Sequence, residues 1–259
     1  MPIFRRVTNF AEPDGPLFSG NFAQKPLIFN GRLKLVSYNI DKGRQVEQGL
    51  QDLQTLPPLI GADIILLQEM DEKGTEKIAA ALGYNFVYYP ASILQGQNFG
   101  NGILSRWTIL RPQKLILPHT SRFNGQIRIA VRATVLVNGR PLLIYCVHTE
   151  IYTASVRHRR NQAAAVINDI PLDAEQVIVG GDFNTVSSRS IRRLTAQFSE
   201  AGLKRASKGA GGTVSKYATN SVAADHIFTW GFEALDRGKV KEAQASDHYP
   251  LWVELRMIE

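Results

Sequence analysis

Two polar side chains end an apolar run in the second half of the chain. The segment "VIVGGDFNT", residues 177–185, is typical of a buried strand that finishes on Asp182 and Asn184. Residues two apart in an extended chain point to the same side, so this carboxylate and this carboxamide can act together on one bound group. A single aspartate after a strand is more often a turn residue or a helix cap, so the pair does not define a site by itself.

Polar residues stand at the ends of four other apolar runs. "LKLVSY" leads into Asn39 and Asp41, "DIILLQ" into Glu69, "LLIYCV" into His148, and the last run, "YPLWVEL", is preceded by Asp247 and His248. The ends of buried strands form the rim of a crevice in sheet proteins, so we expect these residues to converge although they are far apart in sequence. Five such coincidences favour a site over five separate turns.

The residue types indicate metal-assisted chemistry. Hard oxygen donors, the ligands that Mg²⁺ or Mn²⁺ prefers, come from Asn39, Asp41, Glu69, Asp182, Asn184 and Asp247. His148 and His248 can change protonation near neutral pH and can donate hydrogen bonds to phosphate. The sequence has no P-loop, no G-x-S-x-G elbow and no H-E-x-x-H motif. The remaining chemistry is attack of water on phosphorus with the help of a metal ion.

The composition is that of a globular protein with a basic surface. The 259 residues, 44% of them hydrophobic and 20% charged, suit one large domain. The net charge of +7 favours polyanionic partners such as nucleic acid or anionic lipid headgroups. The single cysteine, Cys146, excludes an internal disulfide and is expected to be a buried packing residue. No continuous apolar core of signal-peptide length stands near residue 1 and no 18 apolar residues follow one another, so we expect no secretion, no transmembrane segment and a cytoplasmic monomer.

The elements that must position these residues alternate along the chain. Residues 1–32 are predicted to be an irregular N-terminal arm packed on the domain, and residues 33–259 form the domain itself. Helical patterns cover residues 45–56, 74–82, 154–169 and 188–201, and residues 127–137 alternate as a half-exposed strand. Strands without helices between them, around residues 85–148, favour mixed sheets. We predict an α+β fold with two packed sheets and outer helices, and a long loop over residues 206–220.

An ordered set of short motifs resembles the endonuclease/exonuclease/phosphatase superfamily. The set is "SYNIDKG", "LLQE", "GNGILSR", "VHTE", "GGDFN", "ADHIF" and "SDHYPL", and it spans roughly residues 33 to 255. The most specific parts are "GGDFN" and "SDHYPL". The resemblance implies a four-layer αββα sandwich of two packed mixed β-sheets flanked by helices, and a phosphoesterase that depends on a divalent metal.

The resemblance also implies roles for individual residues. Glu69 would be the principal metal ligand, with Asn39, Asp41 and Asp247 near the ion, which we expect to be Mg²⁺ or Mn²⁺. The residues expected to act in catalysis or on the phosphate are His148, Asp182, Asn184, Asp225 and His248. Among these, Asp182 would position or deprotonate the attacking water, and Asn184 would bind a phosphate oxygen together with Asn39. His248 would contact the phosphate while Asp225 orients it, although Asp247 could also do so.

Family resemblance leaves the substrate open. The charge favours nucleic acid, cleaved as a phosphodiesterase or nuclease. One alternative is a phosphatase or phosphodiesterase on inositol phosphates or phospholipid headgroups, and another is a noncatalytic nucleic-acid-binding module on the same fold. The histidine in "VHTE" departs from the tyrosine usual in apurinic-site endonucleases, and Phe183 departs from the threonine of tyrosyl-DNA phosphodiesterases.

Several other residues are expected to have structural or surface roles. His119, His158 and His226 are expected to be surface or packing residues. The R-x-x-Q pair of Arg159 and Gln162 is expected to be structural. The apolar face of the same helix is expected to comprise Val156, Ala163, Ile167 and Ile170. Arg128 and Arg132 lie on one face of their strand, which could border the crevice or face solvent.

Overall fold

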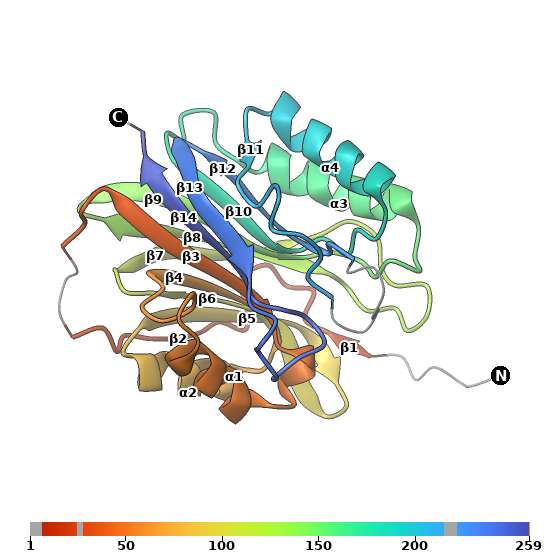
Figure 1. The fold of residues 1–259 in the computed structure, drawn as a ribbon. Coiled ribbons are helices and arrows are strands. Elements are labelled where there is room, and N and C mark those ends of the chain that lie inside the picture. The colour runs from red at the N-terminus through yellow and green to blue at the C-terminus, as the bar shows by residue number, and fades with distance from the viewer. Residues whose placement is uncertain (1–6, 25–27, 215–221, 259) are drawn as a thin grey trace.

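Two β-sheets pack face to face, and helices cover the outer face of each sheet (Figure 1). The structure is a computed structural model that describes residues 7–24, 28–214 and 222–258. Helices α1 and α2 lie outside the first sheet, at the bottom of Figure 1, and α3 and α4 lie outside the second sheet, at the upper right. The four layers confirm the predicted αββα sandwich with mixed sheets.

The first sheet runs in the order β1-β5-β6-β4-β3-β14-β13, and β2 also pairs with β5. Its strands are β1 (Thr8–Asn9), β2 (Phe18–Gly20), β3 (Arg32–Asn39), β4 (Ile64–Met70), β5 (Asn85–Leu94), β6 (Gln97–Ser105), β13 (Phe232–Lys239) and β14 (Leu251–Met257). Strands β3 and β4 are parallel, so their carboxyl ends lie at the same edge.

The second sheet runs in the order β11-β12-β10-β9-β8-β7. Its strands are β7 (Ile109–Ile116), β8 (Ile129–Val137), β9 (Arg140–His148), β10 (Val177–Asp182), β11 (Lys204–Arg205) and β12 (Asp225–Trp230). Here β9 and β10 form the parallel pair, and β10 is antiparallel to β12. Each sheet therefore has one parallel pair whose crossover contains a helix.

The helices form where the sequence predicts them. They are α1 (Val46–Thr55), α2 (Glu72–Leu82), α3 (Val156–Asn168) and α4 (Ser188–Glu200), with a short 3₁₀ turn, η1 (Asp41–Gly43), after β3. Side-chain caps fix three of the N-termini: the side chains of Asp71, Ser155 and Ser187 accept hydrogen bonds from backbone N–H groups in the first turns of α2, α3 and α4. Gly83, in the left-handed region at φ 70°, ends α2.

Three apolar clusters hold the four layers together. The central cluster lies between the sheets and contains side chains such as Leu66, Ile144 and Ile178. A second cluster joins the first sheet to α1 and α2, and a third joins the second sheet to α3 and α4. Because β3, β4, β9 and β10 are covered on both faces, their sequences are continuous apolar runs with little alternation.

The N-terminal arm is more regular than the sequence indicates. Strands β1 and β2 both pair with β5, which would otherwise be the edge of the first sheet. The Lys114 ammonium donates hydrogen bonds to the backbone carbonyls of Phe10 and Gly15 and so holds the arm against β7. Short strands of two and three residues give no periodic signal, so the sequence could not reveal them.

The segment from residue 206 to residue 220 and the start of α3 were also predicted from the sequence. The predicted loop over residues 206–220 has no regular element up to Val214, which makes isolated bridges to Val222 and His248, while residues 215–221 lie outside the described residues. The prediction that Val156 lies on the apolar face of its helix is wrong. Val156 is the first residue of α3 and is 41% exposed. Among the described residues, no helix has the length and apolar character needed to cross a bilayer.

Candidate active site

The carboxyl ends of the two parallel pairs meet across the sandwich. Asn39 ends β3, Glu69 lies near the end of β4, and His148 and Asp182 are partners at the ends of β9 and β10. The Asn39 amide donates to the Asp182 carboxylate over 3.1 Å and to the Glu69 carboxylate over 3.4 Å. Asn39 therefore joins the polar groups of the two sheets, as expected for residues at strand ends.

Three residues at or just after these strand ends have a left-handed backbone conformation. Asp41, Glu69 and Asn184 have φ angles of 35°, 57° and 50°, which non-glycine residues adopt only rarely. The pairing of β4 with β6 is irregular between Leu67 and Met70, the stretch that contains Glu69. Such strain persists only where surrounding structure enforces it, and it often occurs at functional sites.

Asp182 is buried at the centre of the cluster. One carboxylate oxygen accepts from the Asn184 backbone N–H over 2.8 Å, and the other accepts from the side chains of Asn39 and Asn184. Burial and the nearby Asp225 carboxylate raise the pKa of Asp182 to about 7, while His248 acts in the opposite direction. A carboxylate with this pKa is a better proton acceptor near neutral pH than an ordinary aspartate.

His248 and Asp225 form a close pair beside Asp182. The His248 Nδ1 lies 2.9 Å from an Asp225 carboxylate oxygen, and its Nε2 lies 3.9 Å from Asp182 Oδ2. Although burial lowers it, the charge and hydrogen bond of Asp225 raise the pKa of His248 to about 10. The imidazole is therefore protonated at neutral pH. Asp225 contacts this ring, and Asp247 adds a further negative charge that raises the pKa of His248.

His148 lies on the other side of Asp182 and has the opposite electrostatic environment. Its Nε2 is 3.7 Å from both Glu69 Oε1 and Asp182 Oδ2, and the ring packs against Phe99. Burial, together with the positive charge of Arg128, holds the pKa of His148 well below its ordinary value. The ring is therefore neutral, and the two histidines of the site differ in charge.

Arg128 is a site residue that the sequence left undecided. Its guanidinium lies 3.2 Å from His148 Nε2 and 3.6 Å from the Glu150 carboxylate, and the residue is only 5% exposed. Its position in the crevice rules out the solvated-face alternative for Arg128. By contrast, Arg132 is half-buried and bonds Asp169 over 2.9 Å, away from the site. Strand alternation places both arginines on one face, but it cannot show which one reaches the strand ends.

Asp41 and Glu69 flank Lys42, a site neighbour that no motif in the sequence indicates. The Lys42 ammonium lies 2.6 Å from Asp41 Oδ1 and 3.5 Å from Glu69 Oε2. Burial opposes the shift, but the hydrogen bond and charge of Lys42 lower the pKa of Asp41 below its ordinary value, and Arg44 adds to this effect. The Glu69 Oε2 atom is buried and has no hydrogen-bond partner.

Asn184 and the minor histidines have defined partners. The Asn184 side-chain amide donates to the Thr149 carbonyl and to Asp182, so both of its N–H donors are used within the site. His226 is buried and bonds Thr185, whereas His119 stacks on His158 near the surface. These positions agree with the expected packing and surface roles.

Arg159 and Gln162 bind backbone as a structural pair should. The Arg159 guanidinium donates to the carbonyls of Ile151 and Ala154. The Gln162 side chain accepts from Glu150 N and donates to the Pro118 carbonyl. Together they fix the segment between β9 and α3.

Two groups of donors could hold a divalent cation. The buried Glu69 Oε2, with Asn39 and Asp41 beside it, offers the hard oxygen atoms that Mg²⁺ prefers. Among the described residues, ligand atoms of Asp182, Asp225 and His248 also lie within 4.8 Å of one another. The residues present therefore fit a divalent metal.

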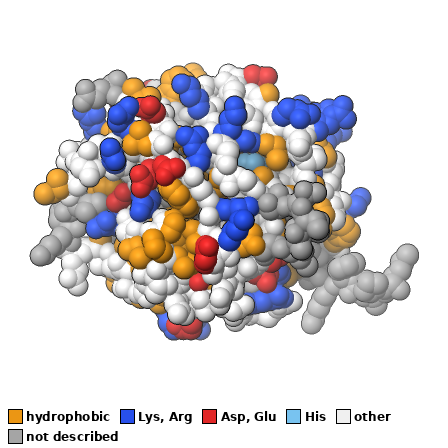
Figure 2. Space-filling model, viewed as in Figure 1, with side chains coloured by type: hydrophobic (Ala, Val, Ile, Leu, Met, Phe, Trp, Pro, Cys, Tyr) orange, Lys and Arg blue, Asp and Glu red, His pale blue; other side chains and the backbone are white. Residues whose placement is uncertain are grey.

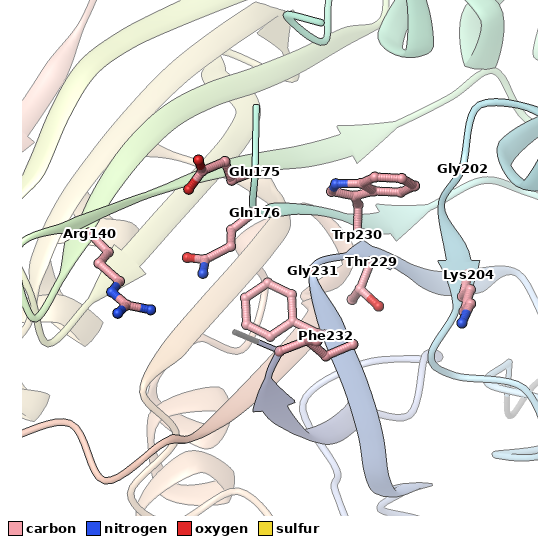
Figure 3. Close-up of a pocket in the computed structure, with 10 residues that line it drawn as sticks. Arg140, Glu175, Gln176, Gly202, Lys204, Thr229, Trp230, Gly231 and Phe232 are labelled. Atoms are coloured by element: carbon pink, nitrogen blue, oxygen red, sulfur yellow. The ribbon is translucent and has the colours of Figure 1, made fainter. Parts of the chain in front are cut away.

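A cavity of about 420 Å³ opens beside these groups. Lys42, Glu69 and Arg128 line its polar side, and Leu94, Phe99 and Phe123 line its apolar side. A larger pocket of about 540 Å³ lies at the opposite ends of β10 and β12, where Gln176, Trp230 and Phe232 line it (Figure 3). That pocket contains none of the predicted site residues, so we place the chemistry at the smaller cavity.

The four-layer fold and these polar groups are those expected of the endonuclease/exonuclease/phosphatase family, and sequence comparison agrees. The chain belongs to the endonuclease/exonuclease/phosphatase family, whose model matches residues 36–248. Members of this family are metal-dependent hydrolases of phosphoester bonds. The resemblance seen in the motifs is thus confirmed.

Curated relatives are distant. A UPF0294 protein of Vibrio cholerae is 27% identical over 123 residues, which are 48% of this chain and 43% of that protein. A UPF0294 protein of Vibrio vulnificus is 27% identical over 233 residues, which are 88% of this chain and 78% of that protein. The chain thus matches less than half the length of the Vibrio cholerae relative.

Solved structures share the fold at lower identity. A family protein from Leptotrichia buccalis has a TM-score of 0.72 and 17% identity, covering 87% of this chain and all of that one. A humanized TDP2 of D. rerio has a TM-score of 0.68 and 18% identity, covering 88% and 100%. A mannosyl-6-phosphatase of Bacteroides thetaiotaomicron has a TM-score of 0.65 and 20% identity, covering 86% and 99%. These similarities show the fold alone.

Proposed function

We propose that the chain is a phosphodiesterase that cleaves nucleic-acid phosphodiester bonds by attack of water. The observation that supports this most directly is the contact of Asn39 with both Glu69 and Asp182, between His148 and His248. These residues come from both sheets and have the differing charge states that proton transfer to and from a phosphoester requires. The net charge of +7 supports a polyanionic substrate.

We assign the metal to the Glu69 side of the cluster. Glu69 would be the principal ligand, with Asn39 and Asp41 beside it and Asp247 nearby, and Mg²⁺ or Mn²⁺ fits this oxygen donor set. When bound, such an ion offsets the negative charge that develops on phosphate oxygens. The ion's identity and a cytoplasmic location stay predictions.

The side chains divide the remaining work according to their protonation. Asp182 accepts a proton from the attacking water, and the amides of Asn39 and Asn184 hold its carboxylate in place. His248, kept protonated by Asp225, donates a hydrogen bond to a phosphate oxygen. Neutral His148 contacts the phosphate from the other side. The Arg128 guanidinium, which lies against His148, adds positive charge there. Asn184 must exchange one of its internal hydrogen bonds to contact phosphate itself.

A second candidate is hydrolysis of a phosphoester that carries an apolar group, such as a phospholipid headgroup ester. The cavity beside the site favours it, because the apolar Leu94, Phe99 and Phe123 line the same space of about 420 Å³ as the cationic Lys42 and Arg128. The noncatalytic alternative is not supported, because the family consists of hydrolases and the expected polar set is present.

The test is hydrolysis of a substrate panel with Mg²⁺ or Mn²⁺, with and without chelator. The panel contains plasmid and single-stranded DNA, RNA, bis-p-nitrophenyl phosphate, inositol phosphates and sphingomyelin. We expect metal-dependent turnover of DNA or RNA that falls about 10²- to 10⁴-fold in Asp182→Asn. Asp236→Asn, an exposed carboxylate on β13, is the matched control and should keep native activity. Turnover confined to sphingomyelin or inositol phosphates would reject the nucleic-acid proposal.

A further inference from the structure

Five arginines on the outer helices of the second sheet form a basic surface outside the catalytic cluster. They are Arg157 and Arg160 on α3 and Arg189, Arg192 and Arg193 on α4, and all five are exposed. We call them the helix arginines. Figure 2 shows blue side chains gathered at the upper right, over the region where Figure 1 places α3 and α4.

No acidic side chain in the described part of the chain pairs with the helix arginines. None of them forms an ion pair or a side-chain hydrogen bond with the described residues. Neither α3 nor the first three turns of α4 contain an acidic residue. Their five positive charges are therefore not neutralised by an ion pair with any described residue.

Their spacing places them together on adjacent helices. Arg157 and Arg160 are three residues apart, and Arg189 is three and four residues before Arg192 and Arg193, so each group lies on one helix face. Helices α3 and α4 pack against each other, and Gln197 of α4 donates to the Arg160 carbonyl. Arg160 and Arg193 line a single hollow between the helices.

Helix polarity gives an independent reason to assign a ligand to this surface. The N-terminal turn of a helix carries partial positive charge, and basic residues there are unfavourable by about 0.3–1 kcal/mol each. Arg157 lies in the first turn of α3 and Arg189 in the first turn of α4, and neither turn contains an acidic residue. A bound anion would offset both the arginine charges and the helix dipoles.

The topology connects this surface to the catalytic cluster. Helix α3 follows β9, which ends on His148, and α4 follows β10, which ends on Asp182. Since β9 and β10 are parallel, both helices begin at the edge where the phosphate site lies. A chain of phosphates held at Asp182 can therefore continue across the helix arginines.

We propose that the helix arginines bind the phosphate backbone of a nucleic acid whose scissile phosphate lies at Asp182. This inference rests on the proposed function and adds a second, noncatalytic contact surface that selects long substrates over short ones. Repeated charges one helical turn apart suit a polymer of regularly spaced phosphates. A membrane surface fits less well, because the exposed residues of α4 are serine, arginine, alanine and glutamate, and α3 adds only Val156 as an exposed apolar side chain.

The experiment measures binding and turnover separately in a variant with all five helix arginines changed to glutamine. Binding of a fluorescent 30-nucleotide strand is followed by anisotropy at several KCl concentrations, with chelator present to prevent cleavage. The slope of log K against log salt should decrease in magnitude by about 3 to 4 relative to the native protein. A control variant removes five exposed cations elsewhere, Lys73, Arg140, Lys204, Lys208 and Lys241, and should change this slope by less than one.

Turnover distinguishes this inference from the proposed function. In the helix-arginine variant, kcat/KM for the 30-nucleotide strand should fall at least tenfold at moderate salt, while hydrolysis of bis-p-nitrophenyl phosphate should change by less than twofold. Equal losses on both substrates, or native salt dependence of binding, would overturn the inference. If the native protein hydrolyses neither substrate but the variant loses DNA binding, the proposed function fails and the binding surface stands.

Two further measurements exclude misfolding and lipid binding. Circular dichroism and thermal unfolding should show a folded variant with an unchanged or higher Tm, because two arginines leave the N-terminal turns. Vesicles of phosphatidylcholine with phosphatidylserine are tested in parallel. Arginine-dependent binding to vesicles without binding to DNA would reject the nucleic-acid assignment.

Discussion

Lys42 is positioned as a competitor for the metal ion. Its ammonium contacts both Asp41 and Glu69, which are the proposed ligands. Removing this charge in Lys42→Met should tighten Mg²⁺ binding about 3- to 10-fold, because a nearby like charge no longer opposes the cation. The half-saturating Mg²⁺ concentration for turnover and direct Mn²⁺ binding by electron paramagnetic resonance both measure this.

Lys73→Met, on the exposed face of α2, serves as the control for the loss of one positive charge. Weaker metal binding in Lys42→Met would show that Lys42 supports the site and does not compete for it.

His226 makes the free energy of unfolding depend on pH. Burial, with a smaller contribution from Arg205, lowers the pKa of this imidazole from 6.5 to about 3. The folded state thus keeps His226 neutral, whereas the unfolded chain takes up a proton at this imidazole below pH 6.5. The free energy of unfolding is therefore unaffected by His226 above pH 6.5 and decreases as the pH falls from 6.5 toward 3. At pH 5 the loss amounts to about 2 kcal/mol of unfolding free energy.

Urea unfolding of native protein and His226→Gln, at pH 7 and at pH 5 with chelator present, measures this contribution. The variant should lose less stability between the two pH values. Parallel losses in both proteins would show that His226 does not cause the acid sensitivity.

At the scale of the elements, the β9–β10 pair depends on a glycine beside Asp182, the proposed proton acceptor. Gly181 has φ 138°, and a Cβ atom there would lie 2.0 Å from the Val147 carbonyl oxygen. Gly181→Ala should therefore cost about 3 kcal/mol or more, because backbone on the neighbouring strand must move. At Gly180 a Cβ would meet only the tip of Leu66, so Gly180→Ala should cost less. Urea unfolding of both variants tests this order, and equal costs would contradict it.

The N-terminal arm depends on one lysine. Lys114 donates to the carbonyls of Phe10 and Gly15, and burial lowers the pKa of its ammonium. In Lys114→Met these bonds are lost, so amide exchange in β1 and β2 should become about 10-fold faster or more. Hydrogen exchange with mass spectrometry measures this, beside Lys208→Met as an exposed control. Unchanged protection of residues 8–20 would show that strand pairing alone holds the arm.

Periodic elements were predictable from sequence, and local departures were not. The four helices and the buried strands follow from apolar spacing, and the rule that strand ends share an edge brought Asn39, Glu69 and Asp182 together. The positive φ of Glu69 and the burial of Arg128 depend on contacts between distant strands, which leave no pattern in the sequence. Lys42 was missed because a lysine after a strand ordinarily faces solvent.

At the scale of the whole molecule, Cys146 reports on the integrity of the sandwich. The thiol is fully buried between the sheets and contacts Gln68 and the Leu67 carbonyl. Burial raises the pKa of Cys146 to about 12, so the thiol is unreactive in the folded protein. Labelling with a thiol reagent should therefore begin only on unfolding, at the same urea midpoint as the loss of circular dichroism. Labelling at lower urea would reveal that the sheets separate before the helices unfold.

The arrangement of the two sheets also bears on how such a protein can be divided. Each sheet has its own strand–helix–strand crossover, β3-α1-β4 and β9-α3-β10, and each crossover ends on part of the polar cluster. Glu69 comes from the first crossover and Asp182 from the second, so a fragment of the chain with only one crossover lacks one of these two residues. Two separately expressed fragments, cut between β7 and β8, would each be inert, and hydrolysis would appear only on reassembly, as in a split reporter enzyme.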